Sequence, residues 1–347
     1  MNRKDQHVSL AKAFYHTKTN NDFDAVSFVH QSLVSAKLEN VDLSTEFSGF
    51  HLDFPFYINA MTGGSPKTKE INQNLAIIAR ETGLMMATGS ASAALRDPAV
   101  ADSYSVVRKE NPDGLLLTNV GAGRNAQDAE KVIDMMQADG LQVHLNVPQE
   151  IVMPEGDWDF SDWQDNLKEI LTTIKKPIII KEVGFGMTRE TIQQLLALGA
   201  KNIDVSGNGG TSFTQIENTR RKKREFDYLD NWGQSTVISL LEAKSFSHDG
   251  HILASGGIRN AFDIFKALTL GAQSVGISAT FLDKLMSKGV DETIAMIESW
   301  KNELKHLYVL TNCEKTADLI KSPVIISGQP REWAELRGID LKQYAQR

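Results

Sequence analysis

The chain is poor in cysteine: Cys313 is the only one among its 347 residues. A single thiol cannot form a disulfide within the chain, and it excludes a zinc site built from cysteines. Long apolar runs are missing as well, because no stretch approaches the ~18 residues that span a bilayer. The N-terminal segment is polar and lacks the apolar core of a signal peptide. We therefore expect a soluble, cytoplasmic protein without a membrane partner.

An excess of positive charge is also absent. The sequence has 37 Lys and Arg against 44 Asp and Glu, a net charge of −7, which argues against a nucleic-acid partner. A phosphorylated substrate is compatible with this charge, because a local cluster of cations can attract it. The hydrophobic fraction of 41% is that of an ordinary globular protein and is sufficient for a full core.

No Gly-x-Gly-x-x-Gly follows the first apolar run, which argues against a Rossmann domain. Eight apolar runs alternate with helical patterns, at 56–60, 84–87, 115–120, 141–147, 177–183, 202–205, 251–254 and 274–277. Helices are expected between them at 68–82, 98–110, 126–138, 162–175, 188–199, 234–246 and 261–270. Eight such repeats favour a closed (β/α)8 TIM barrel over an open doubly wound α/β sheet. We expect one domain over 1–347, with an N-terminal extension (1–50), the barrel (51–289) and C-terminal helices (290–347), among them 291–310.

Small residues follow the last two predicted strands. Ser255-Gly256-Gly257 and Ser278-Ala279 leave backbone N–H groups uncovered, so that an anionic group can approach them. In (β/α)8 barrels the loops after strands 7 and 8 are a frequent phosphate site. Tight turns that need glycine only for their geometry are the alternative, but the position of both turns in the barrel favours phosphate binding.

The C-terminal ends of the strands, where a barrel carries its reacting groups, are rich in hydroxyls, amides and glycines. They comprise Ala60-Met61-Thr62, Ser90, Asn119, His144-Leu145-Asn146, Gln149-Glu150, Lys181, Ser206, Thr211, Gly256-Gly257 and Ser278-Ala279. Such a lining is typical of a site for a large polar ligand. It offers neither the carboxylate pair of a glycosidase nor a Ser-His-Asp order.

Lys181 follows an apolar run and is expected inside the barrel mouth, where a buried ammonium needs an anionic partner. Three roles are open: a Schiff-base lysine, a cation beside the N1–C2=O edge of a reduced flavin, or an ion pair with Glu182 or Glu150. A flavin lying across the mouth would connect Lys181 with the phosphate site.

The motif His144-x-Asn146-x-x-Gln149-Glu150 leaves the end of the fourth predicted strand. Alternation places His144 and Asn146 on one face of that strand, and the polar residues that follow favour a ligand-binding edge over a core histidine. On an extended segment, Gln149 and Glu150 are expected to point in different directions. Glu150 is the predicted Mg²⁺ ligand, because magnesium usually takes one or two carboxylates together with phosphate oxygens of the substrate.

Two clusters of positive charge lie outside the strands. Arg3, Lys4 and His7 are either solvated or part of a segment that folds over the mouth and brings charge to a diphosphate. The run at 220–224 reads most simply as a solvated loop. A cap over the site or a contact with a neighbouring subunit is the alternative.

Taken together, these motifs resemble the type 2 isopentenyl-diphosphate isomerases, which are FMN-dependent (β/α)8 enzymes. The matching pieces run in order along most of the chain: Arg3-Lys4-x-x-His7, Asn59-Ala-Met-Thr-Gly-Gly64, Gly89-Ser90, Asn119-Val-Gly121, His144-x-Asn-x-x-Gln-Glu150, Lys181-Glu-Val-Gly184, Val205-Ser-Gly-x-Gly-Gly-Thr211 and Ala254-Ser-Gly-Gly257. Single pieces occur across the flavin barrels. The motif ending in Glu150, together with the N-terminal Arg-Lys, is specific to this family.

The resemblance implies a set of site residues. FMN would be bound by Ala60, Met61, Thr62, Ser90, Asn119, Lys181, Ser206, Thr211, Gly256, Gly257, Ile258, Ser278 and Ala279. The substrate would meet Arg3, Lys4, His7, Ser90, Ser92, His144, Asn146 and Gln149, and the metal would meet Glu150. Phe213 stands where many members have tryptophan, which would alter stacking at that position. No phosphate role is transferred to Arg96, because the second strand end varies in the family.

The resemblance also implies a reaction: interconversion of isopentenyl and dimethylallyl diphosphate in isoprenoid biosynthesis, by a homo-oligomer (tetramer or octamer). The difficult step is protonation of an alkene, and the strand ends offer no evident acid, since Gln149 is neutral and Glu150 would hold the metal. This favours reduced FMN, at N5, as the group that supplies and removes protons, with NADPH as its reductant. Gln149 and Lys181 are the predicted catalytic residues, Lys181 holding the reduced ring anionic at N1.

Two rival functions are open at this point. An FMN-dependent oxidoreductase of the 2-hydroxy-acid oxidase type needs a base, commonly a histidine after strand 7. His251 begins that strand, whereas its end is Ser255-Gly256-Gly257. A non-enzymatic phosphate-binding barrel is the second rival, which a flavin spectrum and reductant-dependent turnover would separate from an enzyme.

Overall fold

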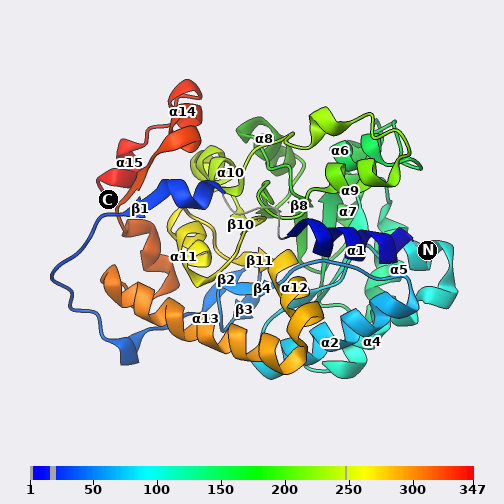
Figure 1. The fold of residues 1–347 in the computed structure, drawn as a ribbon, viewed down its shortest axis with the longest axis horizontal. Helices are drawn as coiled ribbons and strands as arrows, with labels where there is room; N and C mark the ends of the chain where they lie inside the picture. The colour runs from blue at the N-terminus through cyan, green and yellow to red at the C-terminus, as the bar shows by residue number, and fades with distance from the viewer. Residues whose placement is uncertain (1–2, 16–20, 247) are drawn as a thin grey trace.

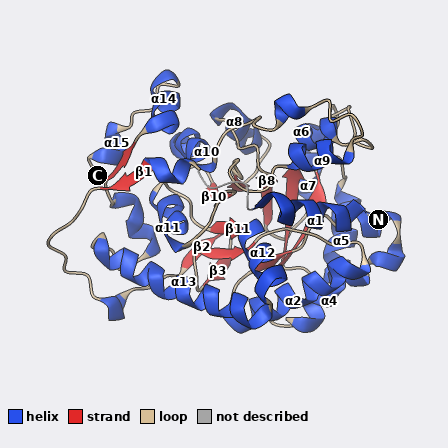
Figure 2. Ribbon diagram, viewed as in Figure 1, coloured by secondary structure: helices blue, strands red, loops and turns tan. Residues whose placement is uncertain are grey.

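Eight parallel strands close into a barrel in this computed structural model, which describes residues 3–15, 21–246 and 248–347 (Figures 1 and 2). Around the barrel they are β4 (Phe56–Ile58), β5 (Met86–Ala87), β6 (Leu116–Gly121), β7 (Gly140–Leu145), β8 (Ile178–Glu182), β9 (Asn202–Asp204), β10 (His251–Ser255) and β11 (Val275–Ile277). β11 pairs with β4 and so closes the ring. The predicted (β/α)8 barrel is confirmed, and each strand falls on one of the eight apolar runs.

A helix follows each barrel strand and packs outside it. These helices are α2 (Pro66–Thr82), α4 (Asp102–Glu110), α5 (Ala126–Met136), α7 (Trp163–Thr173), α8 (Arg189–Ala197), α10 (Thr236–Ala243), α11 (Ala261–Thr269) and α12 (Ala279–Lys288). Their starts follow from capping residues: the Ser65 side chain accepts from the N–H of Thr68 ahead of α2, and Asn260 caps α11 in the same way. The predicted helix at 98–110 begins as a 3₁₀ turn, η3 (Pro98–Val100), and becomes α-helical in α4.

The N-terminal end of the barrel is closed by a hairpin of β2 (Thr45–Phe47) and β3 (Phe50–Leu52). Phe47 and Phe50 pack with buried Leu117, Ile179 and Leu253 from the barrel strands. This apolar plug leaves only the opposite end, where the strands finish, for a polar site.

Four short helices lie around that opposite end. They are α1 (Arg3–Tyr15), α3 (Ser92–Arg96), α6 (Val147–Val152) and α9 (Phe213–Arg220). In Figure 1 α1 lies near α9 and α12, and residues of α1 contact both of these helices. The N-terminal segment therefore folds over the mouth of the barrel. This agrees with the interpretation that Arg3, Lys4 and His7 belong to a covering segment, and not with the one that they are solvated.

The C-terminal part of the chain packs beside the barrel. It consists of α13 (Val290–Leu310), β12 (Val324–Ile326), α14 (Gly328–Leu336) and α15 (Lys342–Ala345), and β12 pairs antiparallel with β1 (Val26–Phe28). The division of the chain at residues 50 and 289 stays a prediction. No helix within the described residues is long and apolar enough to cross a membrane.

Candidate active site

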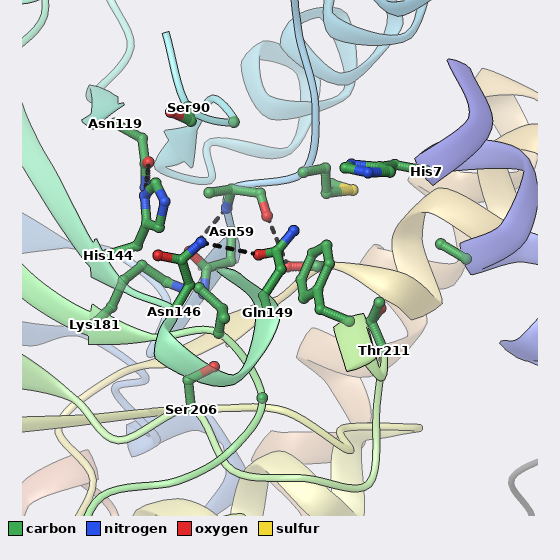
Figure 3. A pocket seen from close by; sticks show the side chains of 18 of the residues that line it. His7, Asn59, Ser90, Asn119, His144, Asn146, Gln149, Lys181, Ser206 and Thr211 are labelled. Carbon is green, nitrogen blue, oxygen red and sulfur yellow. Dashed lines mark hydrogen bonds between the residues drawn. The ribbon is translucent and has the colours of Figure 1, made fainter. Parts of the chain in front are cut away.

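A cavity of about 960 Å³ opens at the C-terminal ends of the barrel strands. All the site residues predicted from the sequence line it: Arg3, Lys4, His7, Ala60, Met61, Thr62, Ser90, Ser92, Asn119, His144, Asn146, Gln149, Glu150, Lys181, Ser206, Thr211, Gly256, Gly257, Ile258, Ser278 and Ala279. Figure 3 shows several of these side chains projecting into the same space from different strands and loops. The fold thus gathers them around one ligand-sized cavity, while the ligand that each one binds stays a prediction.

One side of the cavity, the glycine wall, consists of Gly209, Gly210, Gly256 and Gly257 with Ser278 and Ala279. Gly256 and Gly257 have φ angles of +92° and +74°, a region that L side chains rarely adopt. A Cβ on Gly256 would lie 2.0 Å from the carbonyl oxygen of Gly207. The turn therefore requires glycine, and its backbone is bare toward the cavity, as an approaching phosphate needs.

Other groups near this wall also fit a bound cofactor. The Oγ1 atom of Thr62 is buried and has no hydrogen-bond partner among the described residues, although Thr62 lines the cavity. A buried hydroxyl without a partner is costly, so a polar atom of a ligand would satisfy it. Asn21 also supports the turn, because its Nδ2 donates to the carbonyl of Gly257 at 2.6 Å.

Lys181 comes from the end of β8 and lies at the bottom of the cavity, 5% exposed. Its Nζ donates to the backbone carbonyl of Glu182 at 2.6 Å, and no ion pair with Glu182 or Glu150 occurs among the described residues. Burial lowers the pKa of Lys181, whereas the charges of Asp204 and Glu182 oppose that shift. The ammonium is available to an anionic ligand group above it.

The carboxylate of Glu182 binds backbone groups instead of the Lys181 ammonium. Its Oε2 accepts from the backbone N–H groups of Val183, Gly184 and Phe185, at 2.6, 3.1 and 2.8 Å. Burial raises the pKa of Glu182 to about 8 in spite of these bonds. It therefore shapes the loop after β8 and is not the ion-pair partner that one sequence interpretation gave to Lys181.

The polar motif after β7 is helical, which corrects the prediction of an extended segment. β7 ends at Leu145, and Asn146 precedes α6, so strand alternation does not extend to it. On a helix, successive side chains diverge by about 100°, so Gln149 and Glu150 still point in different directions. The Nε2 of Gln149 donates to Glu217 Oε1 at 2.9 Å, and Glu150 Oε1 accepts from Asn146 Nδ2 at 2.8 Å. Pro148 stands in the first turn of α6, where helices commonly carry proline, and is a local signal for this helix.

A second part of the cavity lining, the helix wall, consists of Arg3, Lys4 and His7 of α1 and of Glu155. It is backed by Glu217 and Arg220 of α9. Glu217, with a fully buried side chain, is the central residue, or hub, of the helix wall. His7 Nε2 lies 2.9 Å from Glu217 Oε1, and Arg220 contacts Glu217 Oε2. Burial alone would raise the pKa of Glu217, but His7, Gln149 and Arg220 bring it down to about 2. The carboxylate is therefore ionised at neutral pH and ties α1 to α9 and α6.

Arg220 connects the hub to a further segment of the helix wall. It donates to Glu155 Oε1 at 2.6 Å, in addition to its contact with Glu217. Lys222 and Lys223, by contrast, are exposed. The solvated-loop interpretation of the basic run therefore fails for Arg220 and holds for these two lysines.

Arg96 of α3 also lines the cavity, although no role was predicted for it from the sequence. Burial and the nearby charges of Arg3 and Arg96 lower the pKa of Lys4 to about 8. Three cationic side chains thus meet at one end of the cavity. An anionic ligand there would relieve their mutual repulsion.

His144, at the end of β7, also lines the cavity. Its Nδ1 lies 2.7 Å from Asn119 Oδ1, the contact drawn in Figure 3. Burial, followed by the positive charges of Lys181 and Lys4, lowers the pKa of His144 to about 3. The imidazole is neutral at physiological pH.

Sequence reasoning missed Glu217, Asn59, Gln142 and Asp204, which contact the predicted residues or one another. Glu217 carried one local signal, a Glu–Arg pair three residues apart after Gly-Gly-Thr. Asn59 stood inside a recognised motif without a role. Gln142 and Asp204 lie in apolar runs, where a buried polar residue points inward only once the barrel closes.

Comparison with known proteins places this geometry among flavin barrels. The FMN-dependent dehydrogenase family model matches residues 146–326. The isopentenyl-diphosphate delta-isomerase of Latilactobacillus sakei subsp. sakei (strain 23K) is 47% identical over 339 residues, covering 98% of this chain and 97% of the relative. The protein of the same name from Staphylococcus saprophyticus subsp. saprophyticus is 46% identical, with 98% of both chains covered.

Solved structures extend the likeness of fold. A flavocytochrome b2 variant with sulfite bound has a TM-score of 0.67 at 19% identity, covering 97% of this chain and 84% of that chain. A mandelate oxidase variant with an FMN adduct has a TM-score of 0.64 at 14% identity, covering 93% and 92%. Identities this low show the barrel fold alone.

Proposed function

The chain belongs to the isopentenyl-diphosphate delta-isomerases, within the FMN-dependent barrel enzymes, and from this premise we propose that its cavity interconverts isopentenyl and dimethylallyl diphosphate with FMN and Mg²⁺ bound. One observation carries the proposal: a bare glycine wall and a cationic helix wall face one cavity, with Lys181 at its bottom. The glycine wall suits the phosphate of FMN, and the helix wall suits the diphosphate of the substrate. The hydrocarbon part of the substrate would then occupy the cavity between these two anionic groups.

The residues of this chain bind and orient rather than donate the proton. A proton must be added to the terminal alkene carbon and another removed two carbons away, with no net oxidation. Glu217, with a pKa of about 2, is ionised, and His144, with a pKa of about 3, is neutral, so neither is an acid at pH 7. Reduced FMN, when bound, supplies the acid–base group for both transfers. Lys181 would stabilise negative charge on the reduced ring, and Gln149, held by Glu217, would orient the alkene.

The donor set fits a magnesium ion that arrives with the diphosphate. Among the residues described, no three or more His, Cys, Asp or Glu side chains gather into a preformed metal site. Glu150 offers one carboxylate at the cavity, where Glu155 and Asp157 also lie, and Mg²⁺ usually combines one or two carboxylates with substrate phosphate oxygens. NADPH as the reductant, assembly into a homo-oligomer and a cytoplasmic location belong to the same proposal.

The oxidase alternative is not favoured. The curated relatives that cover nearly the whole chain are isomerases. His251, the one histidine of β10, begins that strand, contacts Gln273 and lies near Phe47 of the plugging hairpin. It is therefore at the wrong end of the barrel to act as a base.

A turnover assay under anaerobic conditions tests the function. Purified protein receives isopentenyl diphosphate, FMN and Mg²⁺, with or without NADPH, and dimethylallyl diphosphate is measured. We expect product only when the flavin is reduced, and many turnovers for each NADPH oxidised. Equal rates with oxidised flavin would make the flavin structural, and stoichiometric consumption of NADPH would indicate an oxidoreductase.

A further inference from the structure

A continuous chain of buried side chains crosses the interior of the barrel beneath the cavity. Asn119 Nδ2 donates to Gln142 Oε1 at 3.3 Å, and Gln142 Nε2 donates to Asn59 Oδ1 at 2.9 Å. Asn59 Nδ2 then donates to Asp204 Oδ2 at 3.2 Å. At the other end, Asn119 Oδ1 meets His144 Nδ1 at 2.7 Å. Three amides therefore connect a buried carboxylate to the imidazole at the cavity.

The direction of this chain is fixed by two groups that have no choice of role. A carboxylate can only accept, so Asn59 must turn its NH₂ group toward Asp204. A backbone N–H can only donate, and the N–H of Ala60 donates to Asn59 Oδ1 at 2.8 Å. Both constraints orient the Asn59 amide the same way, with its oxygen toward Gln142. Gln142 must then donate to Asn59 and turn its own oxygen toward Asn119. Asn119 in turn donates to Gln142, which leaves its oxygen for His144.

The carboxylate that anchors the chain is itself held in place. Asp204 is 0% exposed, and its oxygens accept from Ser255 Oγ at 2.9 and 2.8 Å and from the N–H of Ser206 at 3.1 Å. These donors fix the position of the carboxylate and use its oxygens as acceptors. It also lies near enough to Lys181 for its charge to support that ammonium.

We propose that this chain locks His144 in the tautomer that carries its proton on Nδ1, so that Nε2 is an acceptor at the cavity. Asn119 can offer only Oδ1 to the ring, because its NH₂ group is committed to Gln142. Asp204, Asn59 and Gln142 are then positioning residues for His144. Free histidine in water prefers the other neutral tautomer, so the chain imposes the less common one.

The lock has a consequence for anion binding, and this consequence rests on the proposed function. A neutral Nε2 that accepts cannot donate to a diphosphate oxygen. Lys181 of β8 and Lys4 of α1 are the charged groups that face the ring, and both oppose a positive charge on it. A diphosphate that neutralises those cations removes their part of the opposition, so the pKa of His144 should rise on binding, although burial, the larger cause of its low value, remains.

Nitrogen-15 spectra of the histidine rings test the lock directly. The FMN-loaded protein is labelled with ¹⁵N-histidine, and the His144 signals are assigned by their loss in His144→Gln. At neutral pH we expect a protonated Nδ1 and an unprotonated Nε2, which differ widely in chemical shift. A His144 signal of the Nε2–H tautomer, or of the charged ring, in the unliganded protein would overturn the proposal.

Two substitutions break the chain at different points. Gln142→Met keeps the length of the side chain but removes both contacts, so the Nδ1–H to Nε2–H ratio should fall by about fivefold to tenfold, the effect of one neutral hydrogen bond. Asp204→Asn replaces one acceptor oxygen by an NH₂ group, which would face either the NH₂ group of Asn59 or the N–H of Ser206. This variant should therefore also lower the Nδ1–H to Nε2–H ratio. If Asp204→Asn fails to fold, Gln142→Met still decides the matter, because it leaves the anchor intact.

Thr118→Val is the matched control. Thr118 lies next to Asn119 on β6, is fully buried, and its Oγ1 has no hydrogen-bond partner among the residues described. Its replacement should leave the tautomer unchanged. An unchanged tautomer in Gln142→Met, or an equal change in Thr118→Val, would show that the chain does not set it.

Inorganic pyrophosphate with Mg²⁺ then tests the consequence on the same labelled protein. We expect the pKa of His144, followed through its ring nitrogen signals in a pH titration, to be higher with pyrophosphate bound than without it. Bound pyrophosphate without that rise would contradict the consequence. Failure of pyrophosphate to bind would instead count against the proposed substrate site. The proposal on the His144 tautomer would not be affected, because it is tested on the protein without pyrophosphate.

Discussion

The two walls of the cavity are built by opposite means. The glycine wall is made of backbone at the ends of β9 and β10 and at the start of α12, and the close approach of Gly256 to Gly207 fixes its shape. The helix wall is made of charged side chains from three separate segments, held together by Glu217 and Arg220. The glycine wall should keep its shape when pH or salt changes but should not accommodate an added side-chain atom. The helix wall should accommodate added atoms better than the loss of a charge.

The contacts within the helix wall also differ among themselves. Arg3 and Glu155 are 3.5 Å apart with side chains 29% and 44% exposed, and exposed pairs of this kind contribute little. Glu217 is completely buried and binds three partners, so losing it would leave charges unpaired away from water. Among the charged contacts of the helix wall, the one with Glu217 should therefore contribute most to holding α1, which also packs on α12.

Gly256→Ala is the strongest test of the glycine wall. The added methyl group would lie 2.0 Å from the Gly207 carbonyl oxygen, so the turn must shift. We expect FMN affinity to fall about a hundredfold, close to 3 kcal/mol, the upper range for overpacking. Fluorescence titration of the apoprotein with FMN measures the loss.

Gly271→Ala is the control for this substitution. Gly271 has a φ of +113°, but a Cβ at this position would meet nothing within 4 Å, so the variant shares the backbone strain without the clash. It should lower stability by about 1 kcal/mol and leave FMN affinity unchanged. Equal FMN loss in both variants would mean that strain, and not the close approach, shapes the wall.

Glu217→Gln is the corresponding test of the helix wall. It keeps the size of the side chain but leaves His7 and Arg220 without their anion, and should cost about 3 kcal/mol. We expect faster hydrogen exchange in residues 3–15 and a substrate KM raised by about thirtyfold, with FMN affinity retained. Glu225→Gln removes an exposed partner of Arg221 on the neighbouring loop and should change neither quantity.

The pH dependence of this contact follows from the lowered pKa of Glu217. A carboxylate whose pKa falls to about 2 on folding contributes stability above its unfolded pKa, near 4.3, and loses it as the pH falls toward 2. Exchange in α1 should therefore increase over that acid window in the native protein. If Glu217→Gln shows the same acid response, another group is responsible.

Gln149 and Glu150 allow a smaller test between the walls, because they are neighbours on α6 with different partners. Gln149→Ala should lower kcat and leave the Mg²⁺ dependence nearly unchanged. Glu150→Gln should raise the Mg²⁺ concentration needed by about tenfold, since it removes the charge from the proposed carboxylate ligand. A magnesium titration of both variants decides between these roles. Wild-type metal dependence in Glu150→Gln would show that this carboxylate is not the ligand.

The same contrast explains how far sequence reasoning could reach. The glycine wall was predictable because Gly256-Gly257 and Ser278-Ala279 are local signals at the ends of recognisable strands. The helix wall was only half predictable: Arg3, Lys4 and His7 stood out, but Glu217, the partner of His7, lies more than two hundred residues away. No periodicity connects such residues, since only the closed barrel brings α1 and α9 together. The helical form of α6 was missed for a related reason, because its apolar residues continue the strand pattern.

Lys4 provides the finest distinction between the walls, because its charge is the one most easily lost near neutral pH. Its pKa of about 8 means that the ammonium is present at pH 7 and disappears as the pH rises to 9. Since kcat/KM reports the free enzyme, it should fall above pH 8, whereas kcat should fall less because bound diphosphate keeps the proton in place. Arginine stays charged throughout this range, so Lys4→Arg should change kcat/KM by only about twofold at pH 7 and move the alkaline limb upward. Lys12→Arg, on the same helix but outside the cavity lining, should leave the limb where it is. If kcat/KM of Lys4→Arg still falls at the same alkaline pH, another group is responsible, and buried Lys181 is the first candidate. The pH-sensitive charge would then lie at the bottom of the cavity instead of in the helix wall.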